Sequence, residues 1–358
     1  MPKRAKENTV NAHPENSAGS HAVTPPRAAA SNPAIKPPVE PKRSAYAIEH
    51  VVANPDETPV TATDSRVDGE KPVSLWAGAW RQLRRKPTFI IAALLILLAV
   101  LVAAFPQLFW TEDPSKAQCL LENSNGKSAP GHPLGYTFQG CDVYSRVIAG
   151  TRASLIVGLF STLGVVVLGG AIGALAGYFG GWLDFILSRL GDIFFALPLI
   201  LGAIVMFQLP MFRDGRNAWT IVLILVVLGW PSVARIMRGA VVEVRGSDYV
   251  TSARSLGVSP LGILYKHVLP NALAPVIVIA TISLGTFIVA ESTLSYLGIG
   301  LPPTTASWGN DISDGRNSFR SNPWPVFWPG LALSLTVLSF IMLGDALRDA
   351  LDPKSRKK

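Results

Sequence analysis

Few side chains in this sequence combine the residue type and the spacing that catalysis or metal binding requires. Five histidines occur among 358 residues, but they are scattered and form no metal-ligand cluster. No acid, base and nucleophile are grouped as a membrane enzyme would need. The chain also lacks the Gly-x-x-x-x-Gly-Lys-Ser/Thr loop that cradles the phosphates of ATP. We therefore expect no enzyme activity, no metal and no cofactor on this chain.

Two cysteines, Cys119 and Cys141, are the candidates for a covalent cross-link. They are too few for a disulfide-built scaffold or a four-thiolate zinc site. A bond between them would close a loop of roughly 20 residues and stabilise it by about 3 kcal/mol. In an oxidising compartment this disulfide is plausible, and two unpaired thiols are the alternative.

One carboxylate, Glu291, lies late in an apolar stretch of the sequence. Because charge inside a membrane is costly, such a carboxylate is by default a functional candidate that faces a cavity or a partner. Glu291 is therefore a candidate for a translocation path or gate. The alternative is a helix-end carboxylate at the water boundary. Asp184, Asp192 and Asp345 are expected to be structural or capping groups.

The composition is typical of a membrane protein, with 49% hydrophobic and 16% charged residues. The formal net charge is +8, but no soluble domain remains to carry a basic patch, so nucleic acid is not an expected partner. Residues 1–73 are rich in Pro, Ala, Ser, Thr and charge, and lack a sustained apolar period. We expect them to form a disordered cytoplasmic tail, with either a partner-binding role or no specific role.

Residues 74–87 are expected to form a basic segment at the membrane interface. Trp76 and Trp80 suit the interface, and the cluster Arg81–Lys86 suits anionic lipid headgroups. Membrane lipid is therefore an expected partner of this segment.

Six stretches are long and apolar enough to cross roughly 30 Å of hydrocarbon as helices. They are Thr88–Trp110, Leu155–Ala176, Leu190–Leu209, Ala218–Ile236, Ala272–Leu297 and Val326–Leu347. Gly169, Gly173 and Gly177 stand four residues apart, which places them on one helical face and favours close helix packing. The sequence predicts an all-α polytopic membrane protein, with a six-helix transmembrane domain over 88–353 and a basic C-terminus at 354–358.

Basic residues predict the orientation of the chain. Lys and Arg gather before the first span, between the fourth and fifth spans, and at the C-terminus. With six spans these three groups fall on one side, which the positive-inside rule assigns to the cytoplasm. We therefore expect both ends inside, an external loop over 111–150 that contains both cysteines, and a cytoplasmic loop over 237–270.

The segment 247–275 is too polar to span a membrane and long for a turn. We expect it to form two short helices, the first capped by Asp248 and ended by Gly257 in the left-handed conformation. Ser259 would cap the second helix, with Pro260 at its first position.

These two helices would form a protrusion with an apolar edge. The apolar residues are Leu256, Val258, Leu261 and Leu264. Arg254 and Lys266 flank them. An exposed apolar edge on a rigid protrusion suits docking of a partner, and a loop lying on the lipid surface is the alternative.

This segment resembles the cytoplasmic signature loop of ABC importer permeases, whose pattern is Glu-Ala-Ala, three residues, Gly, nine residues and Ile-x-Leu-Pro. The strict matches are Ala253, Gly257, Leu269 and Pro270. Thr251 stands in place of the Glu, and His267 stands in place of the Ile. The run from His267 to Ala272 is similar to the peptide-importing branch of the family.

Other motifs follow in the order of the same family. His132–Gly135 and Gly140–Arg146 resemble its external segment, with Cys141 where the family usually has Arg. Glu291–Leu301 resembles the end of its fifth span, and Gly344–Pro353 resembles its C-terminal signature. The resemblance covers roughly residues 74–353 and indicates the second permease subunit of the dipeptide, oligopeptide and nickel importers, with a type I ABC importer permease fold.

The resemblance implies a transport subunit in the bacterial cell membrane that imports short peptides. Its expected partners are a homologous sister permease, one or two ATPase chains that carry ATP and Mg, and an external substrate-binding protein. The residues expected to couple to the ATPase are Ala253, Arg254, Leu256, Gly257, Val258, Pro260, Leu261, Leu264, His267, Leu269 and Pro270.

Two alternatives remain open at this point. The same machinery could import nickel, heme or another small solute, because the binding protein largely sets the choice of substrate. An ion-gradient-driven secondary transporter is the second alternative. It is disfavoured because the central parts of the spans carry little charge and the basic loop has no role in it.

Overall fold

The computed structural model describes residues 75–114, 119–213 and 215–351, and within these residues the chain is helical with no strand. All of these described residues belong to one compact unit. The expected tail at 1–73 and the basic C-terminus at 354–358 lie outside the described residues.

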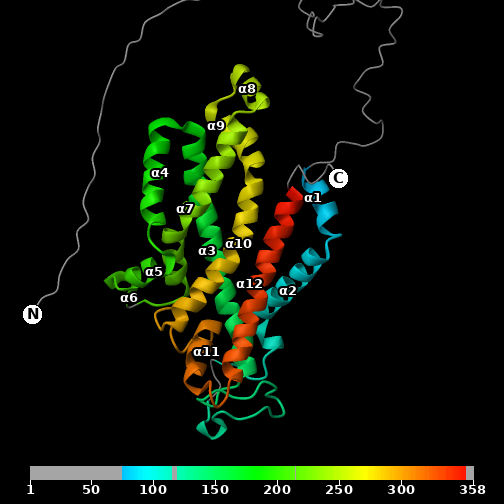
Figure 1. Cartoon of the computed structure of the whole chain (residues 1–358), viewed down its shortest axis with the longest axis vertical. Helices are drawn as coiled ribbons and strands as arrows, with labels where there is room; N and C mark the ends of the chain where they lie inside the picture. Colours follow the sequence, from blue (N-terminus) through cyan, green and yellow to red (C-terminus); the bar gives the residue numbers. More distant parts are fainter. Residues whose placement is uncertain (1–74, 115–118, 214, 352–358) are drawn as a thin grey trace, which may run out of the picture. The chain divides into compact units, whose positions relative to one another are not determined.

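Five helices of the described part are long and apolar enough to cross a membrane. They are α2 (Pro87–Ala104), α3 (Val143–Phe179), α7 (Ala218–Arg245), the continuous α9–α10 helix (Pro260–Tyr296) and α12 (Trp324–Leu351). Shorter helices connect them, namely α1 (Leu75–Leu83), α6 (Pro210–Arg213), α8 (Asp248–Ser255) and α11 (Trp308–Gly315). Figure 1 shows α8 at one end of this unit, and α11 with the loop before α3 at the other.

The third expected span is not one straight helix. In its place α4 (Gly181–Phe195) and α5 (Leu199–Phe207) meet at an angle of 82°. Pro198 precedes α5 with a non-helical ψ of 126°. A proline both lacks an N–H donor and disfavours helix at the residue before it. The prediction of a single helix over Leu190–Leu209 is therefore wrong, and a sixth crossing exists only if this bent pair forms it.

The central contact of the unit is between α3 and α7, whose backbones approach closely. A Cβ atom added to Gly169 would lie 2.5 Å from the carbonyl oxygen of Trp230, and one added to Gly177 would lie 2.8 Å from that of Arg238. At Gly173 the added atom would collide with the carbonyl oxygen of Ala234. The glycine face therefore serves helix packing, as its spacing predicted.

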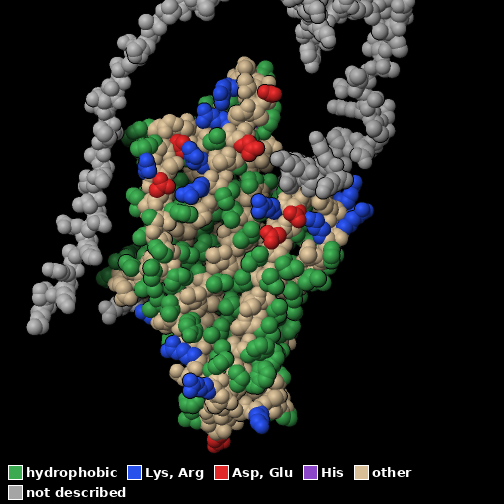
Figure 2. Space-filling view, viewed as in Figure 1, with side chains coloured by type: hydrophobic (Ala, Val, Ile, Leu, Met, Phe, Trp, Pro, Cys, Tyr) green, Lys and Arg blue, Asp and Glu red, His purple; other side chains and the backbone are tan. Residues whose placement is uncertain are grey.

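Large apolar side chains fill the space beside this contact. Ile221, Ile224 and Leu225 of α7 are fully buried in a core cluster that also contains Phe287 of α10. Outward-facing apolar residues remain exposed along α2, α3 and α4, and Figure 2 shows hydrophobic side chains along the flank of the unit. In a membrane protein such an apolar flank faces lipid.

The first helix packs against the last. Ala79 and Leu83 of α1 form a small buried cluster with Ala346 and Ala350 of α12. The Lys86 ammonium lies 2.9 Å from the Asp349 carboxylate just beyond it. The basic segment therefore packs against α12.

We expect Gly173→Ala to destabilise the protein by about 1–3 kcal/mol, because the new methyl group has backbone rather than a movable side chain against it. Thermal unfolding in detergent measures the effect. Gly239→Ala on α7 is the matched control, since nothing lies within 4 Å of its added Cβ. That control should be neutral or stabilising by up to about 1 kcal/mol. Equal unfolding temperatures for both variants would contradict the close approach.

Candidate functional site

A protrusion built from α8 and α9 follows the end of α7. Ser247, not Asp248, is the N-cap residue of α8, and Asp248 begins the helix. The Ser247 hydroxyl donates back to the carbonyl of Val244 at 2.6 Å. Asp248 instead lies in the first turn, where its charge favours the positive end of the helix dipole. The prediction of an Asp248 cap was therefore off by one residue.

Gly257 ends α8 in the left-handed conformation, with φ at +77°. The amide of Val258 donates to the carbonyl of Ala253, and the amide of Gly257 donates to the carbonyl of Arg254. This pair of hydrogen bonds is a Schellman motif, which satisfies two carbonyls that the helix end would leave unpaired. The turn between the helices is thus held by the backbone itself.

The second short helix begins as its sequence predicts but does not end separately. The Ser259 hydroxyl accepts from the amide of Gly262 at 3.3 Å, and Pro260 takes the first helical position. The chain then continues through a π-helical turn, Leu264–Val268, directly into α10. Pro270 has no N–H to donate, and the amide of Leu269 donates five residues back to Leu264. The second short helix of the protrusion and the span are therefore one continuous helix, Pro260–Tyr296.

The exposed apolar edge of the protrusion differs from the expected one at two positions, Leu264 and Tyr265. Leu256 is 83% exposed and Leu261 is 54% exposed, but Leu264 is buried in the core cluster. The prediction that Leu264 forms part of the exposed edge is wrong. Tyr265, which the sequence did not single out, is 66% exposed instead. Tyr265 stands four residues after Leu261 and therefore on the same helical face.

Some of the remaining residues of the protrusion are buried against the helix bundle, and others are exposed. Ala253 is buried with Val250 and Ile263, so it packs α8 against the helix bundle. His267 and Leu269 are half-buried. The exposed residues of the predicted set are Arg254, Leu256, Gly257, Val258, Pro260, Leu261 and Pro270.

Glu291 lies in α10, near the end that carries α11, and it is fully buried. Its carboxylate accepts hydrogen bonds from the hydroxyls of Ser154 and Ser295, each at 2.8 Å, and from Ser292 at 3.3 Å. Ser154 belongs to α3, so the carboxylate joins α3 to α10. It is therefore not a water-exposed group at a helix end. The sequence identified Glu291 but not Ser154, because their contact spans 137 residues of chain.

A second polar contact fastens α11 to the start of α3. The Nε of Arg146 donates to Asp311 at 2.6 Å, and its Nη2 lies 3.9 Å from Asp314. Burial raises the pKa of the Asp311 carboxyl, and the adjacent Arg146 guanidinium opposes that rise. Burial likewise raises the pKa of Asp314. The indole of Trp308 donates to the carbonyl of Val147 at 3.1 Å beside this pair.

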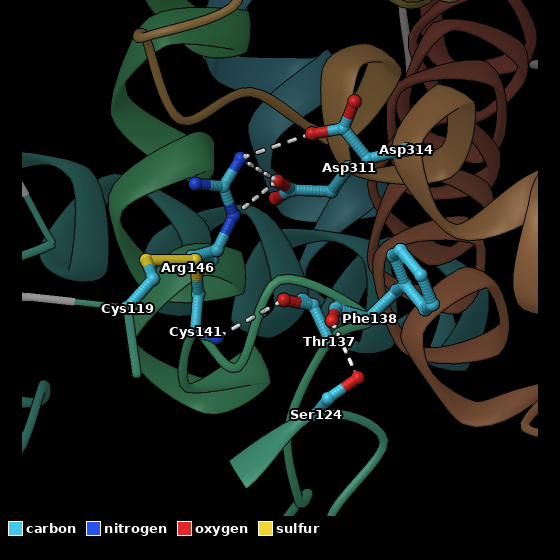
Figure 3. The surroundings of a disulfide bond; sticks show 8 residues. All are labelled: Cys119, Ser124, Thr137, Phe138, Cys141, Arg146, Asp311 and Asp314. Carbon is cyan, nitrogen blue, oxygen red and sulfur yellow. Dashed lines mark hydrogen bonds and ion pairs between the residues drawn. A yellow bond between two sulfur atoms is a disulfide. The ribbon is translucent and has the colours of Figure 1, made fainter. Parts of the chain in front are cut away.

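The loop before α3 is closed by a disulfide between Cys119 and Cys141, with Cα atoms 4.4 Å apart. Figure 3 shows this bond beside Arg146 and its two carboxylate partners. Directly after Cys141, Asp142 caps α3 by accepting from the amide of Ser145 at 2.8 Å. The cross-link thus lies one residue from the start of α3.

Two of the expected structural carboxylates form ion pairs between α4 and α7. Asp184 accepts two hydrogen bonds from Arg238, one of them at 2.6 Å. Asp192 lies 3.6 Å from Arg235 and 3.5 Å from Arg189. Asp345 is exposed on α12. Sequence spacing gave no indication of the pairs with Arg235 and Arg238, because they form between separate helices, whereas Arg189 and Asp192 stand three residues apart in α4.

Two models of known protein families match most of this chain. The model for binding-protein-dependent transport system inner membrane components matches residues 169–357. The model for the N-terminal transmembrane domain of oligopeptide transport permease C matches residues 74–128. The two matches cover both the basic segment and the protrusion.

Curated relatives agree with these matches. A dipeptide transport system permease protein of Alkalihalophilus pseudofirmus is 34% identical over 85% of this chain and 98% of its own length. An oligopeptide transport system permease protein of Bacillus subtilis is 34% identical over 83% of this chain and 95% of its own length. A glutathione transport system permease protein of Pectobacterium atrosepticum is 35% identical over 78% and 91%.

These matches span nearly the whole length of each relative, and they confirm the resemblance that the signature loop indicated. The chain belongs to the binding-protein-dependent transport system inner membrane components, and it is a multi-pass ABC importer permease of the inner membrane.

Proposed function

We propose that this permease imports short peptides and forms half of the translocation path, with a homologous sister permease forming the other half. The proposed substrate rests on one observation. Three relatives of similar sequence identity are named as permeases for dipeptides, oligopeptides and glutathione. All three substrates are short peptides. An external binding protein would deliver the substrate, and partner ATPase chains would bind the ATP and Mg.

We assign the end that carries α8 to the cytoplasm and the end that carries α11 to the exterior. Arg254 and Lys266 lie exposed on the protrusion, and exposed Arg84 and Arg85 follow α1. The positive-inside rule favours the cytoplasm for these groups. The disulfide lies at the opposite end, which suits an oxidising exterior.

The α8–α9 protrusion is the proposed coupling element. Leu256 and Leu261 present apolar side chains that would insert into a groove of an ATPase chain, and Arg254 would pair with acidic groups there. Because α9 continues into α10 without a break, a displacement of the docked protrusion passes along one helix. That helix carries Glu291 near its other end, which links the coupling element to the α3–α10 junction.

Affinity purification of the tagged chain from its native membrane, followed by mass spectrometry, tests this function. We expect a sister permease and one or two ATPases to be recovered. A co-purifying peptide-binding protein would support peptides over nickel or heme. Repeated recovery of the chain without any ATPase, even after crosslinking, would overturn the proposal and favour a secondary transporter.

Leu256→Asp should abolish recovery of the ATPase while leaving the stability of the permease unchanged. The side chain is 83% exposed, so the folded chain loses little, but an interface anchor of this kind contributes about 2 kcal/mol or more to binding. Leu121→Asp, 76% exposed at the other end of the unit, is the matched control. Normal ATPase recovery with Leu256→Asp would exclude Leu256 as an anchor.

Gly257→Val should uncouple ATP hydrolysis from uptake. The left-handed conformation costs a β-branched residue about 1–3 kcal/mol, so the turn between α8 and α9 would rearrange. Gly257→Asn should retain coupling, because Asn tolerates this conformation. Gly246→Ala is the control on the same segment, since its added Cβ meets only ordinary contacts. Peptide uptake per ATP hydrolysed is the measurement, and unchanged uptake by an assembled Gly257→Val importer would refute the role.

Glu291 is proposed to hold α3 and α10 together as part of the external gate. Ser154→Ala removes the hydrogen bond between these helices and costs about 1–3 kcal/mol in this arrangement. We expect basal ATPase activity without binding protein to rise several-fold, because alternative arrangements of the helices become more populated. Thr293→Ala is the control, because the Thr293 hydroxyl donates at an exposed position to the carbonyl of Val289 within the same helix. A lower unfolding temperature with unchanged basal activity would indicate a purely structural role.

A further inference from the structure

We propose that the cleft between α3, α4 and α7 binds the phosphate of an anionic phospholipid. The cleft has a volume of about 390 Å³ and lies where α4 runs back along α3 and α7. Its apolar lining includes Ile172, Leu187 and Trp230, and its charged lining residues are Asp192, Arg235 and Arg238. An apolar wall beside guanidinium groups matches the two chemical parts of a phospholipid.

The charged residues that line the cleft are Asp192, Arg235 and Arg238. Together with their partners beside it, Asp184 and Arg189, they carry a net positive charge. Arg238 is neutralised by two hydrogen bonds to Asp184. Arg189 and Arg235 share a single carboxylate, Asp192, at 3.5 and 3.6 Å. These five groups therefore carry one excess positive charge, and two guanidinium groups keep donors that Asp192 does not use.

Aromatic rings hold the two arginines that share Asp192. The guanidinium carbon of Arg235 lies 4.3 Å from the centre of the Phe195 ring, and that of Arg189 lies 5.6 Å from the Phe185 ring. Cation–π contact of this kind limits the freedom of the guanidinium groups before a ligand arrives. Both side chains remain largely exposed, at 58% and 70%. Their remaining donors are thus accessible from outside the helix bundle.

A lipid source is favoured over a soluble phosphate by the outer surface of α4. Trp182, Phe185 and Ile193 are 78%, 58% and 65% exposed on this helix. Acyl chains can lie along these side chains while the headgroup reaches the arginines. Figure 2 shows basic and acidic side chains over α4 and α7 at the end that carries α8, with hydrophobic side chains beyond them. A soluble phosphate would use the guanidinium groups alone.

The two carboxylates also restrict which anion can bind. A dianion would lie near Asp192 with only one excess positive charge to balance it. A phosphodiester carries a single charge and matches that excess. Phosphatidylglycerol keeps a single negative net charge, whereas the choline cation of phosphatidylcholine offsets its phosphodiester, and inorganic phosphate is partly a dianion near neutral pH. The site should therefore prefer phosphatidylglycerol to both. This inference rests on membrane insertion of the chain and is independent of the proposed substrate and ATPase partners.

Native mass spectrometry of the purified full chain, titrated with phosphatidylglycerol in mild detergent, tests the proposal. We expect one tightly retained phosphatidylglycerol per chain and about tenfold weaker retention with Arg235→Gln. Arg84→Gln is the matched control, because it removes an exposed arginine beyond α1, away from the cleft. Equal retention by wild type and Arg235→Gln would overturn the site, as would equal retention of phosphatidylcholine.

Asp192→Asn separates binding from a structural effect. Removal of this carboxylate frees Arg189 and Arg235 from their shared partner, so phosphatidylglycerol should bind more tightly. If the ion pairs served only to hold α4 on α7, the same variant would lower the unfolding temperature and leave lipid retention unchanged. Displacement of the lipid by millimolar inorganic phosphate would show that the site is not specific for phospholipid and would likewise refute the proposal.

Discussion

The close approach of α3 and α7 is the contact on which the rest of the described structure depends. Gly169, Gly173 and Gly177 leave room for the backbone of α7 where any side chain would meet main-chain carbonyls. Helices in a membrane gain little from burying apolar surface, because lipid is as apolar as their side chains. Close backbone packing is therefore a principal source of their association. The α8 end of α7 leads into the protrusion, so its position follows from this contact.

The second organising feature is that one helix runs from the protrusion across the bundle. Pro270 would be expected to break it, but the π-helical turn at Leu264–Val268 shifts the hydrogen bonding and keeps the chain helical. The Schellman turn at Gly257 holds α8 against the start of the same helix. A rigid protrusion on an uninterrupted helix is suited to transmit displacement, whereas a flexible loop would absorb it.

At the α11 end, polar contacts between segments distant in sequence take over the role that glycines have along α3. Glu291 joins α10 to α3 through Ser154, and Arg146 joins α3 to α11 through Asp311. The disulfide and Asp142 secure the start of α3 beside them. Buried polar groups without such partners would be costly, so each of these pairs favours the observed arrangement of the helices at this end.

The sequence by itself determined the membrane class, most of the spans, the glycine packing face, the left-handed Gly257 and the importer permease family. These properties follow from local composition, spacing and motifs, which can be identified without knowing the tertiary contacts. The tertiary structure alone decided that Leu264 faces inward, that α4 and α5 meet at 82°, and that α9 continues into α10. It also paired Glu291 with Ser154, and Arg146 with Asp311. The inward position of Leu264 and the two pairings depend on which side chains from separate helices come together, and no periodicity within one segment encodes its neighbours. The bend and the continuous helix depend on how the backbone is hydrogen-bonded around Pro198 and Pro270, which residue spacing does not determine.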